Sequence, residues 1–83
     1  KLPMRLDKYL KVSRLIKRRT VANEACDAGK VLVNEKIARA SYDVKVGDVI
    51  AIQMGQKELS VRVEKVPEFV TKEDAVTLYT VLS

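Results

Sequence analysis

Four basic side chains occur within the eight residues SRLIKRRT at positions 13–20: Arg14, Lys17, Arg18 and Arg19. Guanidinium groups bind phosphate oxygens through paired hydrogen bonds, and lysine adds a compact point charge. The same stretch resembles the start of a helix, where free backbone N–H groups also favour anions. Because cations at a helix start oppose the helix dipole, their presence there indicates an external ligand. The chemistry that this cluster predicts is the binding of phosphate groups.

The positive charge of the chain is concentrated in its first quarter. The 83 residues carry a net charge of +5, yet residues 1–19 hold eight basic residues and one acidic residue, a net charge of +7. The remaining residues have a net charge of −2. This asymmetry indicates a polyanion-binding face on an otherwise nearly neutral body. A solvated basic face without a partner is the alternative, but the clustering in a segment that looks folded favours a ligand.

Catalytic and metal-binding patterns are not found in the sequence. With no histidine and one cysteine, the chain offers neither a Cys/His zinc site nor a disulfide framework. The three glycines are far apart, so no phosphate-binding glycine loop is present. Asp43 and Asp48 flank a turn and are expected to form it, and Cys26 is expected to be a small core residue. We therefore expect no enzymatic activity, no cofactor and no metal.

The composition favours structured RNA among the polyanions. Aromatic residues make up only 5% of the chain, whereas single-strand binders use aromatic stacking platforms. Structured RNA is recognised largely through backbone shape and phosphates. A helix-turn-helix DNA reader is the competing module, but its second helix would present Glu24 and Asp27, which repel phosphates.

Two helices are predicted to position the basic residues. Leu6, Tyr9 and Leu10 are spaced as one face of a helix over residues 5–12, whose exposed face carries Lys8 and Lys11. A connector, VSRLIK, directs Leu15 and Ile16 inward. Thr20 is expected to cap a second helix with a face of small residues, and Gly29 is expected to end it in a left-handed conformation.

Strands are predicted after Gly29. The stretch KVLVNEKI reads as two strands joined by a turn at Asn34-Glu35, and Gly-Asp and Gly-Gln turns precede two further strands. The tail TKEDAVTLYTVL is predicted to form a helix capped by Thr71, although its β-branched residues disfavour this. The expected fold class is α+β, with two N-terminal helices packed on a small antiparallel sheet, followed by a short C-terminal element.

Residues 4 to about 54 resemble the S4 RNA-binding domain. The resemblance is carried by RLDK at 5–8, the basic start of the second helix, GKVLVN at 29–34, Ser41, and VGDVI at 46–50. It implies the S4-type (alpha-L-like) fold and the binding of ribosomal or transfer RNA through the helical face. It gives a domain over 4–66 and a tail over 67–83, and residues 1–3, before Met4, are expected to be a cloning remnant.

The resemblance also assigns residues. Asp7 is expected to orient a neighbouring basic side chain and not to touch phosphate itself. Glu35 departs from the family pattern, in which glycine usually follows the hairpin asparagine. The residues expected to face RNA, including Lys11 and Arg14 from the charge pattern, are Arg5, Lys8, Lys11, Ser13, Arg14, Lys17, Arg18, Arg19, Lys30 and Asn34.

Among S4 proteins, the chain is similar to short free-standing bacterial members that act in ribosome-associated quality control, and to the fifteen-kilodalton heat-shock protein family. This similarity implies a cytoplasmic monomer that does not bind membranes. It implies binding to the 23S rRNA and peptidyl-tRNA of obstructed large ribosomal subunits, and support of a factor that adds C-terminal alanines without mRNA. The alternatives are the RNA-binding module of an rRNA- or tRNA-modifying enzyme, a large-subunit recycling or assembly factor, and a module whose basic face meets an acidic protein.

Overall fold

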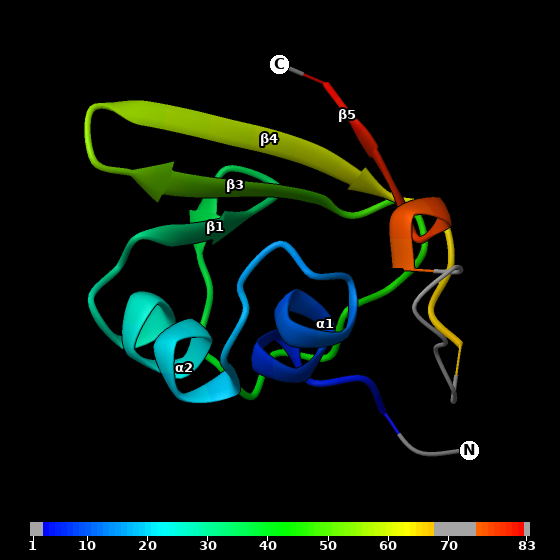
Figure 1. Ribbon diagram of the computed structural model, residues 1–83, viewed down its shortest axis with the longest axis horizontal. Coiled ribbons are helices and arrows are strands. Elements are labelled where there is room, and N and C mark those ends of the chain that lie inside the picture. Colours follow the sequence, from blue (N-terminus) through cyan, green and yellow to red (C-terminus); the bar gives the residue numbers. More distant parts are fainter. Residues whose placement is uncertain (1–2, 68–74, 83) are drawn as a thin grey trace.

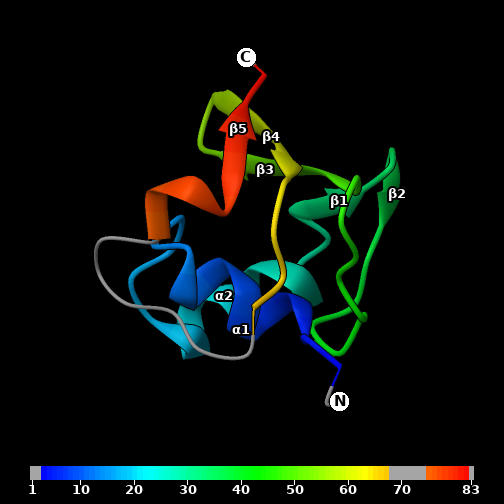
Figure 2. The same cartoon turned by 90° about the vertical axis from the view of Figure 1, so that its right-hand side faces the viewer.

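The computed structural model describes residues 3–67 and 75–82. In these ranges two α-helices, α1 and α2, lie on one face of a five-stranded antiparallel sheet with strand order β2-β1-β3-β4-β5 (Figures 1 and 2). The expected α+β class is therefore confirmed. The elements are α1 Leu6–Val12, α2 Arg19–Asp27, β1 Val31–Val33, β2 Lys36–Ile37, β3 Val49–Met54, β4 Lys57–Val63, the 3₁₀ turn η1 Ala75–Thr77, and β5 Tyr79–Val81.

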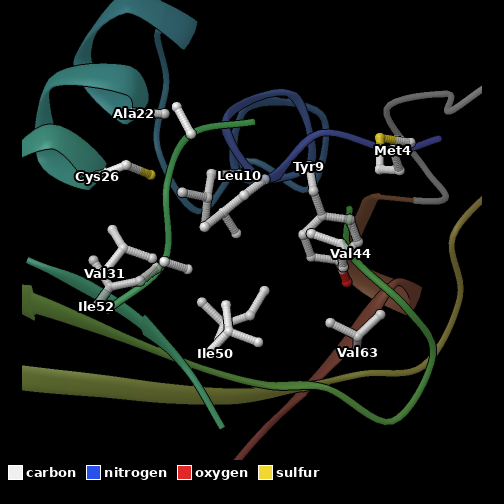
Figure 3. Close-up of a cluster of buried hydrophobic side chains, with 14 of the residues drawn as sticks. Met4, Tyr9, Leu10, Ala22, Cys26, Val31, Val44, Ile50, Ile52 and Val63 are labelled. Carbon is white, nitrogen blue, oxygen red and sulfur yellow. The ribbon is translucent and has the colours of Figure 1, made fainter. Parts of the chain in front are cut away.

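Helix α1 is held to the sheet by its apolar face. Leu6, Tyr9 and Leu10 are fully buried, as their helical spacing predicts, and they pack among core residues such as Ile50 and Val63 (Figure 3). The Tyr9 hydroxyl donates a buried hydrogen bond of 2.8 Å to the backbone oxygen of Leu78, just before β5. Tyr9 is thus a core residue and not a base-stacking platform.

Helix α2 ends as predicted but begins differently. Gly29 has a φ of +74°, and the N–H groups of Gly29 and Lys30 donate to the carbonyls of Cys26 and Ala25. This pairing is the Schellman arrangement that a glycine after a helix favours. The prediction of a Thr20 cap is wrong, because the helix already begins at Arg19 and its N-cap, Arg18, makes no side-chain capping bond.

Tight turns set the register of the sheet. Asn34 and Glu35, the only residues between β1 and β2, have φ values of 52° and 70°. Two consecutive positive φ values are typical of a type I′ turn, whose twist matches that of the strands it joins. The turn therefore keeps the type I′ geometry even though its second residue is Glu35, which is strained at a positive φ where glycine would not be. Gly55, with a φ of +65°, begins the equally short β3–β4 turn.

The tail adds an edge strand to the sheet. Residues of β5 pair antiparallel with β4, Tyr79 opposite Val63 and Val81 opposite Val61. The predicted tail helix is therefore wrong for Tyr79–Val81, and its predicted cap, Thr71, lies outside the described residues. In the part of the chain that the structure describes, no helix combines the length and apolar character needed to cross a membrane.

Candidate nucleic-acid interface

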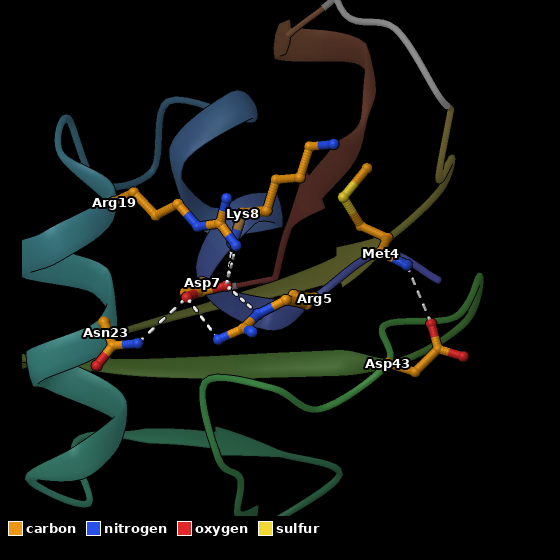
Figure 4. Close-up of polar contacts among 7 residues, drawn as sticks. All are labelled: Met4, Arg5, Asp7, Lys8, Arg19, Asn23 and Asp43. Carbon is orange, nitrogen blue, oxygen red and sulfur yellow. Dashed lines mark hydrogen bonds and ion pairs between the residues drawn. The ribbon is translucent and has the colours of Figure 1, made fainter. Parts of the chain in front are cut away.

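A buried carboxylate joins the two basic helices. The Asp7 side chain is only 3% exposed and accepts hydrogen bonds from two arginines on different elements (Figure 4). Arg5 donates from Nε to Oδ1 and from Nη2 to Oδ2, both at 3.2 Å, and Arg19 donates from Nη2 to Oδ1 at 3.4 Å. Two further donors complete the set: the Lys8 backbone N–H at 2.7 Å from Oδ1 and the Asn23 amide at 3.2 Å from Oδ2.

The charge state of Asp7 follows from these contacts. Burial by itself raises the pKa of this carboxyl, but hydrogen bonds from Arg5, Asn23, Arg19 and the Lys8 N–H outweigh it and hold the pKa below its ordinary value of 3.8. Asp7 is therefore ionised at neutral pH, and both arginines remain paired with it.

Both arginines keep a side exposed to solvent. The side chains of Arg5 and Arg19 are 46% and 47% exposed, although each contacts the buried Asp7. A guanidinium has five N–H donors, so the contact with Asp7 leaves donors available on each group. Because both bind the same oxygen of Asp7, the two guanidinium groups lie close enough to share one phosphate. This arrangement is the one expected of a phosphate-binding surface.

The start of α1 is fixed against the rest of the domain. The backbone N–H groups of Leu6 and Asp7 donate to the carbonyls of Tyr42 and Ala40, at 2.8 and 3.1 Å. Together with the Lys8 N–H bond to Asp7, these contacts use the donors that a helix start normally leaves free. The N-terminus of α1 is therefore not an anion site, and any phosphate contact from α1 must come from its side chains.

The start of α2 is open by comparison. Within residues 3–67 and 75–82, the backbone N–H groups of Arg19 and Thr20 have no acceptor, and no side chain caps the helix. Free donors at a helix start favour anions, as predicted from the sequence. Arg19 is the first residue of α2 and does not lie in the connector before the helix. From this position its side chain reaches Asp7.

Five other basic residues are available to a ligand: Lys8, Lys11, Arg14, Lys17 and Arg18. Their side chains are exposed and make no hydrogen bond or ion pair within the described parts of the chain. We call the basic residues of both helices and their connector the basic helical segment: Arg5, Lys8, Lys11, Arg14, Lys17, Arg18 and Arg19.

Two of the predicted RNA-facing residues make hydrogen bonds within the fold through their side chains. Ser13 is fully buried, and its hydroxyl donates to the Leu10 carbonyl at 3.3 Å, because it caps the end of α1. The Asn34 amide is also engaged within the fold, donating to Asp48 and accepting from the Val49 N–H. The Ser13 assignment is corrected, because its side chain is fully buried, whereas Asn34 is exposed and its contact with RNA stays a prediction.

Lys30 remains exposed and without a side-chain partner among the described residues, at the start of β1. The Asn34-Glu35 turn lies at the opposite end of that strand (Figure 2). Among the described residues, no hydrogen bond or ion pair joins Asn34 or Glu35 to Asp7.

The remaining acids and the cysteine have structural positions. Asp48 is buried and stabilises its local loop by accepting hydrogen bonds from the Tyr42 hydroxyl and the Lys45 N–H, whereas Asp43 accepts from the Met4 N–H and joins the N-terminal segment to the loop before β3. Cys26 is 3% exposed, and burial raises the pKa of its thiol to about 11. Among the described residues, no group of three or more potential metal ligands occurs.

Asn23 belongs to the site but was not among the residues predicted from the sequence. Asn23 follows Arg19 by four residues, so both lie on the same face of α2, and that face meets Asp7. The four-residue spacing is the signal from which its position could have been inferred.

Comparison with known proteins places this geometry in a family. Residues 4–50 match the S4 domain. The chain is 55% identical to the RQC P-site tRNA stabilizing factor of Halalkalibacterium halodurans over 94% of its own length and 89% of that protein. It is 51% identical to the protein of the same name from Bacillus subtilis, over 95% of this chain and 92% of the relative.

Two solved structures have the same fold as this chain. The trimeric structure of Vibrio cholerae heat shock protein 15 covers 99% of this chain, and this chain covers 84% of that one, with a TM-score of 0.89 at 30% identity. The solution structure of the hypothetical protein HP1423 gives a TM-score of 0.83 at 30% identity, over 96% of this chain and 98% of the other. The chain belongs to the S4 domain family.

Proposed function

We propose that this S4-domain protein is a non-catalytic RNA-binding factor of the large ribosomal subunit that acts in the cytoplasm. It binds 23S rRNA and peptidyl-tRNA on subunits obstructed by a stalled nascent chain. There it supports a partner factor that extends the chain with C-terminal alanines without mRNA. The observation that carries the proposal is the basic helical segment, in which two half-exposed arginines are held together by the buried Asp7.

The relatives support this function over the alternatives. Two relatives named RQC P-site tRNA stabilizing factor are about half identical to this chain and are matched over 89% and 92% of their own lengths. Those relatives therefore leave little room for an additional catalytic domain, which disfavours the module of an RNA-modifying enzyme.

Co-sedimentation with purified large subunits tests RNA binding. Arg19→Ala is expected to weaken binding while leaving the chain folded, because Asp7 keeps its hydrogen bonds from Arg5, Asn23 and the Lys8 N–H. The matched control is Arg62→Ala in β4, an equally exposed arginine paired with Glu64 outside the basic helical segment. Equal binding by wild type and Arg19→Ala would contradict the proposal.

Salt and ribonuclease separate an RNA partner from an acidic protein. Each phosphate neutralised releases counterions, so binding should fall steeply as salt rises. A complex captured from cells should dissociate on ribonuclease treatment if RNA holds it, whereas a complex with an acidic protein should persist.

The assignment to alanine tailing has its own test. In cells lacking the protein, a stalled reporter chain should carry fewer C-terminal alanines, and wild type but not Arg19→Ala should restore them. Unchanged tails together with accumulated free large subunits would instead favour a recycling or assembly factor. The mass of the protein in solution tests the prediction of a monomer.

A further inference from the structure

Asn23 is not one of the basic residues proposed to bind RNA, yet it donates a hydrogen bond to Asp7. Its amide nitrogen lies 3.2 Å from Oδ2 of Asp7, the oxygen that also accepts from Nη2 of Arg5 (Figure 4). Asn23 itself is only half-buried and carries no charge. It therefore contributes little to attracting a phosphate directly, but it contacts the group that holds both arginines.

The donors to Asp7 fall into two kinds. Arg5 and Arg19 are charged and half exposed, so a phosphate can compete with Asp7 for them. The Lys8 backbone N–H and the Asn23 amide are neutral and bind one carboxylate oxygen each, Oδ1 and Oδ2. Together these two neutral donors fix the plane of the carboxylate, whichever way the guanidinium groups move.

This division matters because Asp7 is buried. A buried carboxylate that loses its hydrogen bonds carries a large desolvation cost. If both arginines turned partly toward a ligand, Oδ2 would lose its charged donor and would depend on Asn23 alone. With Asn23 in place, both oxygens stay bonded while the arginines engage the ligand.

We propose that Asn23 is a positioning residue for RNA binding, holding the Asp7 carboxylate so that Arg5 and Arg19 present their free donors to a single backbone phosphate. The proposal rests on the proposed RNA-binding function and adds to it a residue that does not itself touch the ligand. The two guanidinium groups act as one site because they meet at the same oxygen, Oδ1.

A double-mutant cycle on the full chain tests this role. The probe is the purified large ribosomal subunit, with affinity measured by co-sedimentation at several salt concentrations. We expect Asn23→Ala to weaken binding about three- to tenfold, the factor equivalent to one net hydrogen bond. In a chain that already carries Arg5→Ala and Arg19→Ala, the same change should have no further effect. Gln56→Ala, which removes an exposed amide in the β3–β4 turn, is the matched control and should bind normally.

Two further measurements distinguish positioning from general stability. In the unbound protein, NMR titration should show a higher pKa for Asp7 in Asn23→Ala than in wild type, because a donor to the carboxylate is lost. If Asn23→Ala does not fold, Asn23→Leu keeps a side chain of similar size, removes the donor and adds no charge, and it should also bind more weakly.

The outcomes separate this proposal from the function on which it rests. If Arg19→Ala weakens binding but both Asn23 variants bind like wild type, the positioning role is wrong and RNA binding stands. If Asn23→Ala weakens binding equally with and without the two arginines, Asn23 acts independently of them and the role is again wrong. If Arg19→Ala also binds like wild type, both proposals fail.

Discussion

Arg14 occupies a backbone conformation that arginine disfavours. It follows Ser13, the C-cap of α1, and has a φ of 64°, and its N–H donates to the Lys11 carbonyl at 3.1 Å. Helices commonly end with glycine at this position, because a left-handed conformation brings the Cβ atom of other residues too close to the backbone. The exposed Arg14 side chain makes no hydrogen bond or ion pair among the described residues that would offset this cost.

Arg14→Gly should therefore stabilise the fold. Removing the side chain relieves a strain of about 1–2 kcal/mol. The greater freedom of glycine in the unfolded chain takes back about 0.5–1 kcal/mol. The net gain of about 0.5–1 kcal/mol corresponds, in a domain of this size, to a rise in unfolding temperature of about 2–8 °C.

The same substitution should weaken RNA binding. Loss of one phosphate contact lowers the slope of log affinity against log salt by about one. Stability is measured by thermal unfolding and affinity by co-sedimentation with large subunits. Arg14→Ala is the matched variant: it removes the same charge and keeps Cβ, so it should lose affinity without the stabilisation.

Glu35→Gly provides the converse control, because Glu35 has a φ of 70° but carries no positive charge. It should raise the unfolding temperature without weakening RNA binding. An unfolding temperature for Arg14→Gly at or below that of wild type would refute the strain argument. Unchanged affinity in both Arg14 variants would show that this arginine does not contact RNA.

Three further predictions concern buried polar groups. Tyr9→Phe should lower the free energy of unfolding by about 0.5–1.5 kcal/mol in chemical denaturation, because one buried hydrogen bond is lost while the Leu78 carbonyl keeps the N–H donors of Glu64 and Lys65; an unchanged value would contradict this. The lowered pKa of Asp7 means that its contribution to stability is complete above the ordinary value of 3.8 and is lost as pH falls through the folded-state pKa. The stability advantage of wild type over Asp7→Asn should therefore shrink on acidification, and an advantage that is constant with pH would refute this. The Cys26 thiol, with a pKa of about 11 and 3% exposure, should react with a thiol reagent at pH 8 only after unfolding, whereas rapid reaction of the native protein would show that it is accessible.

Features governed by local sequence could be predicted well. The helical spacing of Leu6, Tyr9 and Leu10 identified the buried face of α1, since one periodicity determines which side chains meet the core. Gly29 ends α2 because its left-handed conformation suits glycine. The Gly-Gln turn likewise predicted the strand that follows it, β4. Each of these inferences depends on residues that are neighbours along the chain.

Features that depend on how the chain packs in three dimensions were missed or wrong. The tail strand β5 forms because the edge of β4 accepts it, Tyr79 opposite Val63, and this pairing overrides any local helix preference. Ser13 was assigned to RNA from a family pattern, but its side chain is fully buried and its hydroxyl bonds to Leu10. A polar residue type does not reveal whether its partner is a ligand or the protein itself.

The position of the basic residues at the start of α2 has a physical explanation in Asp7. Cations there oppose the helix dipole, and no acidic residue occupies the first turn of α2 to compensate. The compensating negative charge comes instead from the first turn of α1, where Asp7 contacts Arg19 and Asn23. One buried carboxylate thus relieves the repulsion at one helix start, joins the two helices and fixes the arginines that would otherwise disperse in solvent. The chain can therefore keep its densest positive charge where the free N–H groups of α2 add to the attraction for phosphate.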